Sequence, residues 1–241
     1  MEKVYAIFGA SGGIGSVLAR QLSQDNHKVY LLGRNEEKLK QLSEELSQPY
    51  LIVDATDEIL VRQTIETIIK QAGTLDGVAS VIGSFLIKPL HLTTQKEFEE
   101  VMRVNVTTSF CILKSALNLM EKGSIVLSSS TAALIGLTHH EAIAAAKSAI
   151  LGLMRSAAAS YATKGIRVNA VAPGLIRTPL TQAITNSESA LKTSTGFHPL
   201  GRIGEPEDVA AAIKWLLSDE SAFITADVIA VDGGLSSIKL K

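Results

Sequence analysis

The sequence predicts an α/β fold, in which helices flank a doubly wound parallel sheet within a single domain over residues 1–241. Short apolar runs with strand character alternate with helical runs along the whole chain, an order that favours parallel strands joined by right-handed crossovers. At 241 residues and 46% hydrophobic content, the chain suits one large core. No internal repeat, low-complexity tract or linker interrupts the alternation.

The alternation also predicts the elements in chain order. Seven short apolar runs are predicted as strands: Val4–Phe8, Lys28–Leu32, Tyr50–Val53, Val78–Ile82, Ser124–Leu127, Arg167–Val171 and Val228–Val231. The longer runs between them are predicted as helices: Gly13–Gln24, Glu36–Leu46, Glu58–Gln71, Gln95–Met120, His139–Tyr161 and Pro206–Leu217.

Two local signals refine this pattern. Thr138 followed three residues later by Glu141 has the spacing of a capping box, which predicts a helix beginning near His139. Thr178–Leu200 is polar and without clear periodicity, so we interpret residues 178–200 as a mobile substrate flap.

Composition and charge argue against several classes of partner. The net charge of −1 gives no reason to expect nucleic acid or an anionic membrane. No segment approaches eighteen uninterrupted apolar residues, and the first strand begins too early for a signal peptide, so we expect a soluble cytoplasmic protein. Cys111 lies in an apolar helical run and is predicted to be a buried structural thiol. No metal site is predicted.

Three glycines follow the first predicted strand. Gly9, Gly13 and Gly15 lie in FGASGGIG, between a strand and a helix. Glycines there let the backbone approach a pyrophosphate, whose charge is stabilised by the free N–H groups of the helix start. Tight strand–helix turns also use glycine for structural reasons alone. In this context we interpret the glycines as a nucleotide-binding turn.

The ends of the next two strands indicate which nucleotide is bound. An acidic residue after the second strand would accept hydrogen bonds from a ribose 2′-hydroxyl, but the sequence has Gly33 and then Arg34, whose planar fork suits a 2′-phosphate. NADP(H) is therefore the predicted cofactor, with NAD as the alternative if Arg34 is a solvated residue of a charged helix start. Asp54 is a candidate acceptor for the adenine amino group. Its alternative role is to cap the next helix, a role also open to Asp57.

The stretch Ser128–Lys147 contains the candidate active site. Lys147 lies in AIAAAKSAI, among apolar and small residues, where an ammonium needs binding partners. His140 lies two turns before Lys147 on the same side of the predicted helix. Ser130, in the serine-rich end of a strand, is a candidate donor to a substrate oxygen.

The chain resembles the short-chain dehydrogenase/reductase family over essentially its whole length. The resemblance rests on the glycine spacing, Asp54, Asn105 in VMRVN, Ser130 and Lys147, and on the motifs RVNAVAPGLIRTPL, PLGRIGEPEDVA and VDGG. It implies a Rossmann-like sheet of about seven parallel strands. It also implies a small-molecule substrate and a homotetramer, assembled as a dimer of dimers.

The resemblance assigns roles to individual residues. Asn105, Ser130 and Lys147 match the family's catalytic set, in which the lysine binds the nicotinamide ribose. Asn105 would hold a water leading to Lys147, or else be a satisfied buried amide. Residues 173–178 would cradle the nicotinamide amide. The predicted cofactor-binding residues are Gly9, Ser11, Gly13, Ile14, Gly15, Arg34, Asp54, Ala55, Gly83, Lys147, Pro173, Gly174, Ile176 and Thr178.

Three positions depart from the family pattern. Phe8 replaces a threonine before the glycine turn, and Ser80–Gly83 replaces the sequence Asn-Asn-Ala-Gly. These two sites normally touch, so we interpret their joint change as a repacked strand pair. Ile143 occupies the position of the catalytic tyrosine, four residues before Lys147. Isoleucine cannot give or take a proton, so the usual route of carbonyl reduction is closed.

His140 is the candidate replacement for that tyrosine. The family's enoyl-thioester reductases place their tyrosine seven residues before the lysine, which is the position of His140 here. Because a helix start, Lys147 and an oxidised cofactor all disfavour an imidazolium, we expect a neutral imidazole that donates one hydrogen bond. The alternative is a surface histidine paired with His139.

Two functions follow from this pattern. The first is an NADP(H)-dependent oxidoreductase with an atypical proton donor, reducing a small carbonyl or enoyl-type substrate. The second is a catalytically silent NAD(P)-binding sensor or partner subunit. Retention of Asn105, Ser130 and Lys147 favours the first, and Ile143 favours the second.

Overall fold

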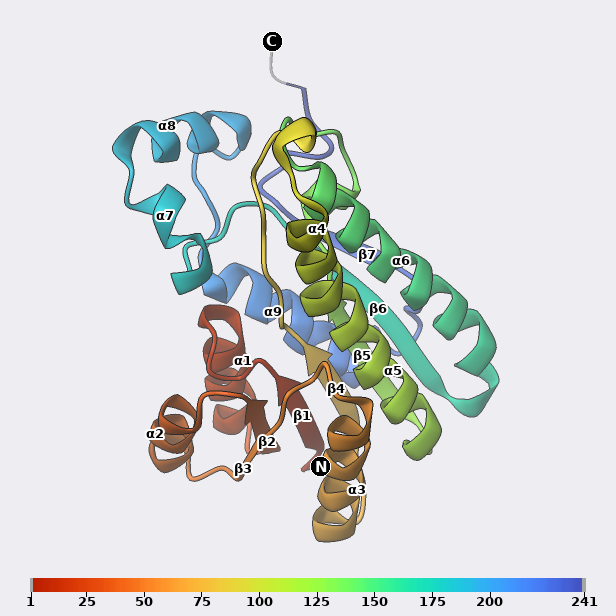
Figure 1. Ribbon diagram of the computed structural model, residues 1–241. Coiled ribbons are helices and arrows are strands. Elements are labelled where there is room, and N and C mark those ends of the chain that lie inside the picture. Colours follow the sequence, from red (N-terminus) through yellow and green to blue (C-terminus); the bar gives the residue numbers. More distant parts are fainter. Residues whose placement is uncertain (1, 240–241) are drawn as a thin grey trace.

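The computed structural model describes residues 2–239 and contains one seven-stranded parallel sheet (Figure 1). The strand order is β3-β2-β1-β4-β5-β6-β7, and each neighbouring pair is parallel. The order reverses beside β1, as a doubly wound sheet requires, so the predicted fold is confirmed. The strands are β1 (Val4–Phe8), β2 (Lys28–Gly33), β3 (Tyr50–Ile52), β4 (Gly77–Ser80), β5 (Gly123–Ser128), β6 (Ile166–Pro173) and β7 (Val228–Val231).

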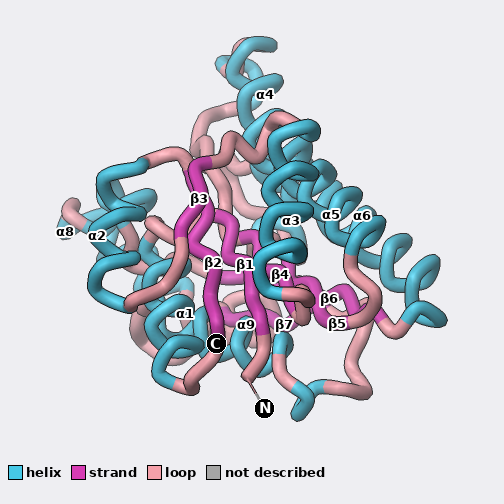
Figure 2. The backbone as a smooth tube through the Cα atoms, turned by 90° about the horizontal axis from the view of Figure 1, so that it is seen from below, coloured by secondary structure: helices cyan, strands magenta, loops and turns pink. Residues whose placement is uncertain are grey.

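Helices cover both faces of this sheet (Figures 1 and 2). One face carries α1 (Gly13–Gln24), α2 (Glu36–Leu46) and α9 (Pro206–Leu217). The other carries α3 (Glu58–Ala72), α5 (Thr108–Leu119) and α6 (Glu141–Tyr161). The remaining helices, α4 (Gln95–Met102), α7 (Gln182–Thr185) and α8 (Glu188–Phe197), lie toward the carboxyl ends of the strands (Figure 1).

The alternation of side chains along β1 explains why two cores form. Ala6 and Phe8 point into the core under α3, α5 and α6, whereas Tyr5 and Ile7 point into the core under α1, α2 and α9. All four side chains are buried. A parallel strand covered on both faces is therefore apolar throughout, which is why these runs are recognisable in the sequence.

The predicted helical region Gln95–Met120 is present over Gln95–Leu119, but its hydrogen bonding is not α-helical throughout. A π-helical turn, Arg103–Thr107, separates α4 from α5. Within it the side-chain amide of Asn105 donates to the carbonyl of Val101 at 2.8 Å. Such widened turns are rare and often occur at functional sites.

The prediction of a capping box at Thr138 and Glu141 is wrong, because no such box forms. His139 has a left-handed backbone, with φ of 64°, so the chain turns between the two residues and the helix begins at Glu141 instead of near His139. His140 occupies the N-cap position, and its side chain makes no capping hydrogen bond.

Two further expectations need correction. Residues 178–200 are not irregular, because they form α7 and α8 after a short 3₁₀ turn. Strand β4 ends at Ser80 instead of at Ile82, and residues 81–83 line the cavities at the sheet edge. The predicted contact between Phe8 and Ser80 is present, because they are paired across β1 and β4.

The segment Glu141–Lys164 is long and apolar enough, by length and composition alone, to cross a membrane. It packs against β6 and buries one face in the core with Ile150, Leu151 and Met154. A core helix of a globular domain has the same composition, so this segment is explained by its packing.

Candidate active site

Two adjoining cavities lie at the carboxyl ends of the strands. A cavity of about 330 Å³ lies over the glycine turn after β1, and one of about 530 Å³ lies over the ends of β5 and β6. They share the lining residues Ile14, Val81, Ile82, Gly83, Thr178 and Leu180. A ligand that is continuous past these residues reaches both cavities.

The smaller cavity has the features of a phosphate site. Helix α1 begins after Gly12 with no side-chain cap, so the N–H groups of its first turn are free to bind an anion. A Cβ on Gly15 would lie 2.2 Å from the carbonyl oxygen of Gly9, and one on Gly13 would lie 2.8 Å from Cγ2 of Thr178. Glycine is therefore required at these positions. Because their missing side chains let the backbone approach a pyrophosphate, the turn fits a dinucleotide.

Arg34 and Asp54 lie at the far end of the same cavity. Arg34 is exposed and has no hydrogen-bond or ion-pair partner among residues 2–239. One oxygen of Asp54 accepts hydrogen bonds from the amide and the hydroxyl of Thr56, and these bonds lower the pKa of the Asp54 carboxyl. Asp57, not Asp54, caps α3 by accepting from the amides of Ile59 and Leu60.

Lys147 lies in the wall of the larger cavity and is 6% exposed. Its Nζ donates to the carbonyl of Ser128 at the end of β5, at 2.9 Å, and the hydroxyl of Ser129 donates to its carbonyl, also at 2.9 Å. Burial lowers the pKa of the ammonium from 10.5 to about 8. A Cβ on Gly83 would lie 3.2 Å from Nζ, so the missing side chain leaves the ammonium open toward the cofactor cavity.

Ser130 and Ile143 line the same cavity. Oγ of Ser130 accepts from the amide of Ala132, and its own proton has no acceptor within the described part of the chain. Ile143 packs with Val101 and Ala146 in a small apolar cluster beside the site. Ser130 therefore retains a hydrogen-bond donor, while Ile143 supplies only apolar surface.

His140 faces the cavity as well, whereas His139 does not line it. Nδ1 of His140 lies 2.7 Å from the carbonyl oxygen of Thr138. A carbonyl only accepts, so Nδ1 carries the proton and Nε2 of the neutral ring is an acceptor. The neutral imidazole expected to donate to a substrate oxygen is therefore wrong for this geometry. In the neutral state Nε2 takes a proton, and only the imidazolium gives one.

Asn105 lies behind the cavity and is fully buried. Its Oδ1 accepts from the amide of Ser84, and its Nδ2 donates to the hydroxyl of Ser84 at 3.0 Å and to Val101. Oδ1 also lies 3.2 Å from the position of a Cβ on Gly83. The amide is satisfied, and it fixes the loop that separates it from Lys147.

The remaining predicted positions lie together. All fourteen predicted cofactor-binding residues line one or both cavities. The apolar lining of the larger cavity comes from segments that lie far apart in the sequence, α7 and α8 among them: Phe85, Ile87, Leu137, Leu180, Ile184, Phe197 and Leu235. Within residues 2–239 no group of three His, Cys, Asp or Glu side chains is placed to hold a metal ion.

Comparison with known proteins identifies the family. A family model described as enoyl-(acyl carrier protein) reductase matches residues 9–236. The chain is 36% identical to the short-chain dehydrogenase/reductase aba4 of Botryotinia fuckeliana, over 97% of this chain and 96% of the relative. The chain belongs to the short-chain dehydrogenase/reductase family. It is 33% identical to the 3-oxoacyl-[acyl-carrier-protein] reductase FabG of Thermotoga maritima, over 97% of both chains.

Solved structures agree with this assignment. A short-chain dehydrogenase/reductase from Mycobacterium ulcerans matches with a TM-score of 0.94 and 33% identity, over 98% of this chain and 90% of that one. ElxO with NADP bound matches with a TM-score of 0.91 and 32% identity, over 99% of this chain and all of that one. The protein is accordingly an NAD(P)-dependent oxidoreductase of this family.

The burial of Lys147 predicts a cost in stability. Its native pKa of about 8 lies below the unfolded value of 10.5, so between these values the unfolded chain holds a proton that the native chain has released. Stability therefore rises with pH across this window, and the full cost, about 3 kcal/mol, is present below it. Lys147→Met loses one hydrogen bond of about 1 kcal/mol and should therefore raise the free energy of unfolding by about 2 kcal/mol at pH 7.

Urea unfolding at pH 7 and pH 10.5 measures this effect. The advantage of Lys147→Met should disappear at the higher pH. Lys114→Met is the matched control, because Lys114 is exposed and paired with Glu58. Its free energy of unfolding should not exceed that of the wild type at either pH. A Lys147→Met variant less stable than the wild type at pH 7 would contradict the burial cost.

Proposed function

We propose that the protein is an NADP(H)-dependent oxidoreductase that reduces a small, uncharged carbonyl or enoyl-type substrate without a tyrosine as proton donor. The observation that carries this proposal is the larger cavity, whose walls bring Ser130, His140 and Lys147 together beside the glycine turn. A site that only binds the cofactor would use Lys147 in the same way, but it has no need of a free serine hydroxyl and a histidine beside that lysine. This argues for turnover and against a silent sensor.

The cofactor proposal rests on the fit of the smaller cavity. The uncapped start of α1 would bind the pyrophosphate, Lys147 the nicotinamide ribose, and Arg34 a 2′-phosphate. When bound, the nicotinamide gives or takes a hydride. Two ElxO structures of the same fold have NADP and NADPH bound, the latter in a tyrosine-to-phenylalanine variant, and they support NADP(H) over NAD.

Proton transfer is assigned to Ser130 and His140. The free hydroxyl proton of Ser130 would bond the substrate oxygen, and Nε2 of His140 would exchange a proton with it. In alcohol oxidation the neutral ring accepts the hydroxyl proton, and in reduction the imidazolium returns it. Conjugated C=C reduction is less demanding, because its enolate oxygen requires only a donor such as Ser130.

The walls of the larger cavity suggest the substrate class. Among residues 2–239 no carboxylate or arginine lines it, and Lys147 is the only lysine that does. Arg202, a candidate for binding a phosphate of coenzyme A, is held by both oxygens of Asp208 at 2.6 and 2.9 Å. Lys192 is exposed and lines neither cavity. An uncharged, largely apolar substrate fits this lining, and residues 178–200 would form the substrate flap above it.

For assembly and location we propose a cytoplasmic homotetramer. Exposed aromatic side chains on α5 (Phe110) and before β7 (Phe223), together with the free edge of β7, are surfaces that subunit contacts would cover. Light scattering during size-exclusion chromatography should give four times the 25.6 kDa chain mass. A monomeric mass at micromolar concentration would exclude the tetramer.

The function is tested by following NADPH oxidation against crotonyl-type thioesters, quinones and diketones. We expect turnover in this panel, and His140→Ala should lower kcat for carbonyl substrates about 100-fold or more, the range of general acid–base catalysis. His139→Ala is the matched control, because this neighbour does not line the cavity. Unchanged turnover in His140→Ala would remove His140 from the mechanism.

The Ile143→Tyr variant completes this test. Gained ketone reduction would show that the rest of the site is competent for the family's usual chemistry. NADPH binding without turnover across the panel, in both wild type and Ile143→Tyr, would instead support the silent sensor.

Cofactor preference is tested at Arg34. Arg34→Ala should raise the dissociation constant for NADPH about tenfold or more, because one charge-assisted pair with the 2′-phosphate is lost, and leave that for NADH unchanged. Quenching of protein fluorescence or NADPH fluorescence enhancement measures both constants. Equal losses for the two cofactors would show that Arg34 does not contact a 2′-phosphate.

A further inference from the structure

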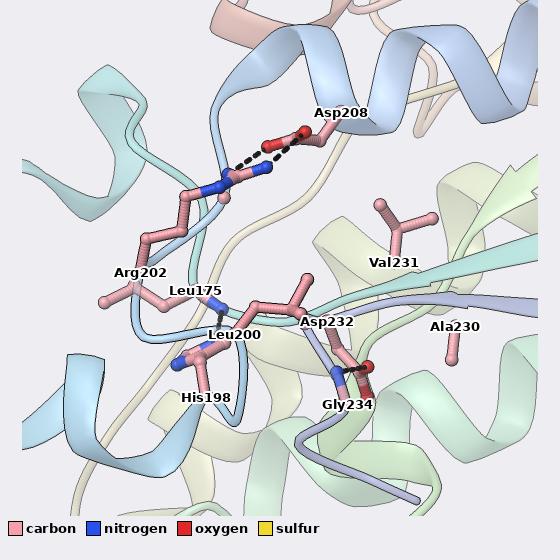
Figure 3. A pocket seen from close by; sticks show the side chains of 11 residues that line it. Leu175, His198, Leu200, Arg202, Asp208, Ala230, Val231, Asp232 and Gly234 are labelled. Carbon is pink, nitrogen blue, oxygen red and sulfur yellow. Dashed lines mark hydrogen bonds and ion pairs between the residues drawn. The ribbon is translucent and has the colours of Figure 1, made fainter.

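His198 is a buried histidine between two cavities. It follows α8, is 4% exposed, and lines both the 530 Å³ cavity and a third cavity of about 310 Å³ (Figure 3). The third cavity is also lined by Leu200 and by residues 232–234 of the turn after β7, none of which borders the larger cavity. The imidazole is therefore part of the wall that separates the two spaces.

Both ring nitrogens of His198 are used by the backbone. Nε2 accepts from the amide of Leu175 at 3.2 Å, as Figure 3 shows, and Nδ1 lies 2.7 Å from the carbonyl oxygen of Ser194. An amide only donates and a carbonyl only accepts, so the ring must be neutral, with its proton on Nδ1. A second proton on Nε2 would face the N–H of Leu175 and break that bond.

The ring also packs tightly against the chain that it bonds. A Cβ on Gly174 would lie 2.7 Å from Nε2, and one on Gly233 would lie 3.6 Å from Cβ of His198. Just beyond His198, Leu200 donates its amide to Gly233. The imidazole thus joins the end of α8 to the loop after β6 and to the turn after β7.

Helix α8 has few other ties to the rest of the protein. It contains no fully buried residue. The hydrogen bonds described for residues 182–197 stay within that segment or go to His198. Yet Ser194 and Phe197 line the larger cavity, so the position of α8 decides the shape of that cavity. The His198–Leu175 bond, together with the Leu200–Gly233 bond just beyond it, fixes the end of the helix.

We propose that His198 is a positioning residue: its neutral ring fastens the end of α8 to Leu175 and holds the flap over the larger cavity, and protonation of the ring releases the flap. The part played by the flap in substrate binding rests on the proposed function. The link itself does not, because it is a property of the fold. The same imidazole therefore couples proton concentration to access to the site.

Charged and titratable groups line both cavities beside His198. Asp232, on the turn after β7, lines the third cavity, and its oxygens accept from Gly234, Ser236 and Thr131. Arg202 and Asp208 line the same cavity and are paired with each other. Lys147 and His140 line the larger cavity.

Hydrogen–deuterium exchange of the full chain at pH 7.5 and pH 5.5, corrected for intrinsic rates, tests the proposal. In the wild type, residues 188–198 should exchange roughly tenfold faster at pH 5.5, since a buried amide then lacks its acceptor. His198→Phe keeps a ring but has no nitrogen to accept the bond. In this variant residues 188–198 should exchange fast at both pH values. His198→Gln keeps an acceptor that does not titrate and should show no pH-dependent step.

His139→Gln is the matched control and should behave as the wild type, because His139 is exposed. Equal protection in the wild type and His198→Phe at pH 7.5 would overturn the proposal, as would a pH-dependent step that persists in His198→Gln. If His198→Phe does not fold, the His198→Gln comparison decides alone. The exchange measurement needs no turnover, so failure of the proposed function is seen separately, in the substrate panel.

Discussion

The buried ammonium of Lys147 is the constraint on which the rest of the site depends. An ammonium inside a protein requires acceptors, and the chain supplies one at Ser128, where β5 extends one residue past its last pair with β4 and the carbonyl accepts from Nζ. The hydroxyl of Ser129 then binds the backbone of the lysine itself. Helix α6 is thereby attached to the sheet edge through both its side chain and its main chain.

This attachment determines what else can stand nearby. Gly83 has no side chain on the side facing Nζ, and Asn105 secures the neighbouring loop through Ser84. The lysine therefore faces the cofactor cavity and not the loop. Since α6 is fixed at Lys147, its first residues must project over the larger cavity, which brings His140 and Ile143 to the wall. Local hydrogen bonds at one residue thus place side chains one and two turns away.

Two histidines near the site have the same tautomer. In both His140 and His198, Nδ1 lies 2.7 Å from a carbonyl oxygen of the chain, which leaves Nε2 as the acceptor. The group that faces Nε2 then decides the role of each ring. At His198 an amide occupies Nε2 and the ring becomes a structural link, whereas at His140 Nε2 is left for a ligand of the cavity. A backbone carbonyl thus places the ring proton on Nδ1 in each case, and at His198 the amide of Leu175 reinforces the same tautomer.

The fold could be predicted from the sequence, because parallel strands that are buried on both faces are continuous apolar runs such as β1. The sequence was also sufficient to gather the cofactor residues, since motifs such as the glycine turn follow strands whose ends meet at one edge. It was insufficient for His140, whose tautomer depends on the left-handed His139 and the carbonyl of Thr138. It also missed α8, because a polar helix that buries no residue fully leaves little periodicity to detect.

The π-helical turn at Arg103–Thr107 makes the fold sensitive to a deletion in this stretch. A widened turn holds one residue more than an α-helical path, so it offsets the faces of α4 and α5 by about 100°. This offset lets Val101 face the apolar cluster beside the active site while Cys111 and Ile112 face the main core. Deleting one residue here would make the helix regular and rotate one of these faces into solvent. A one-residue deletion in this stretch should therefore destabilise the fold more than a substitution at the same place.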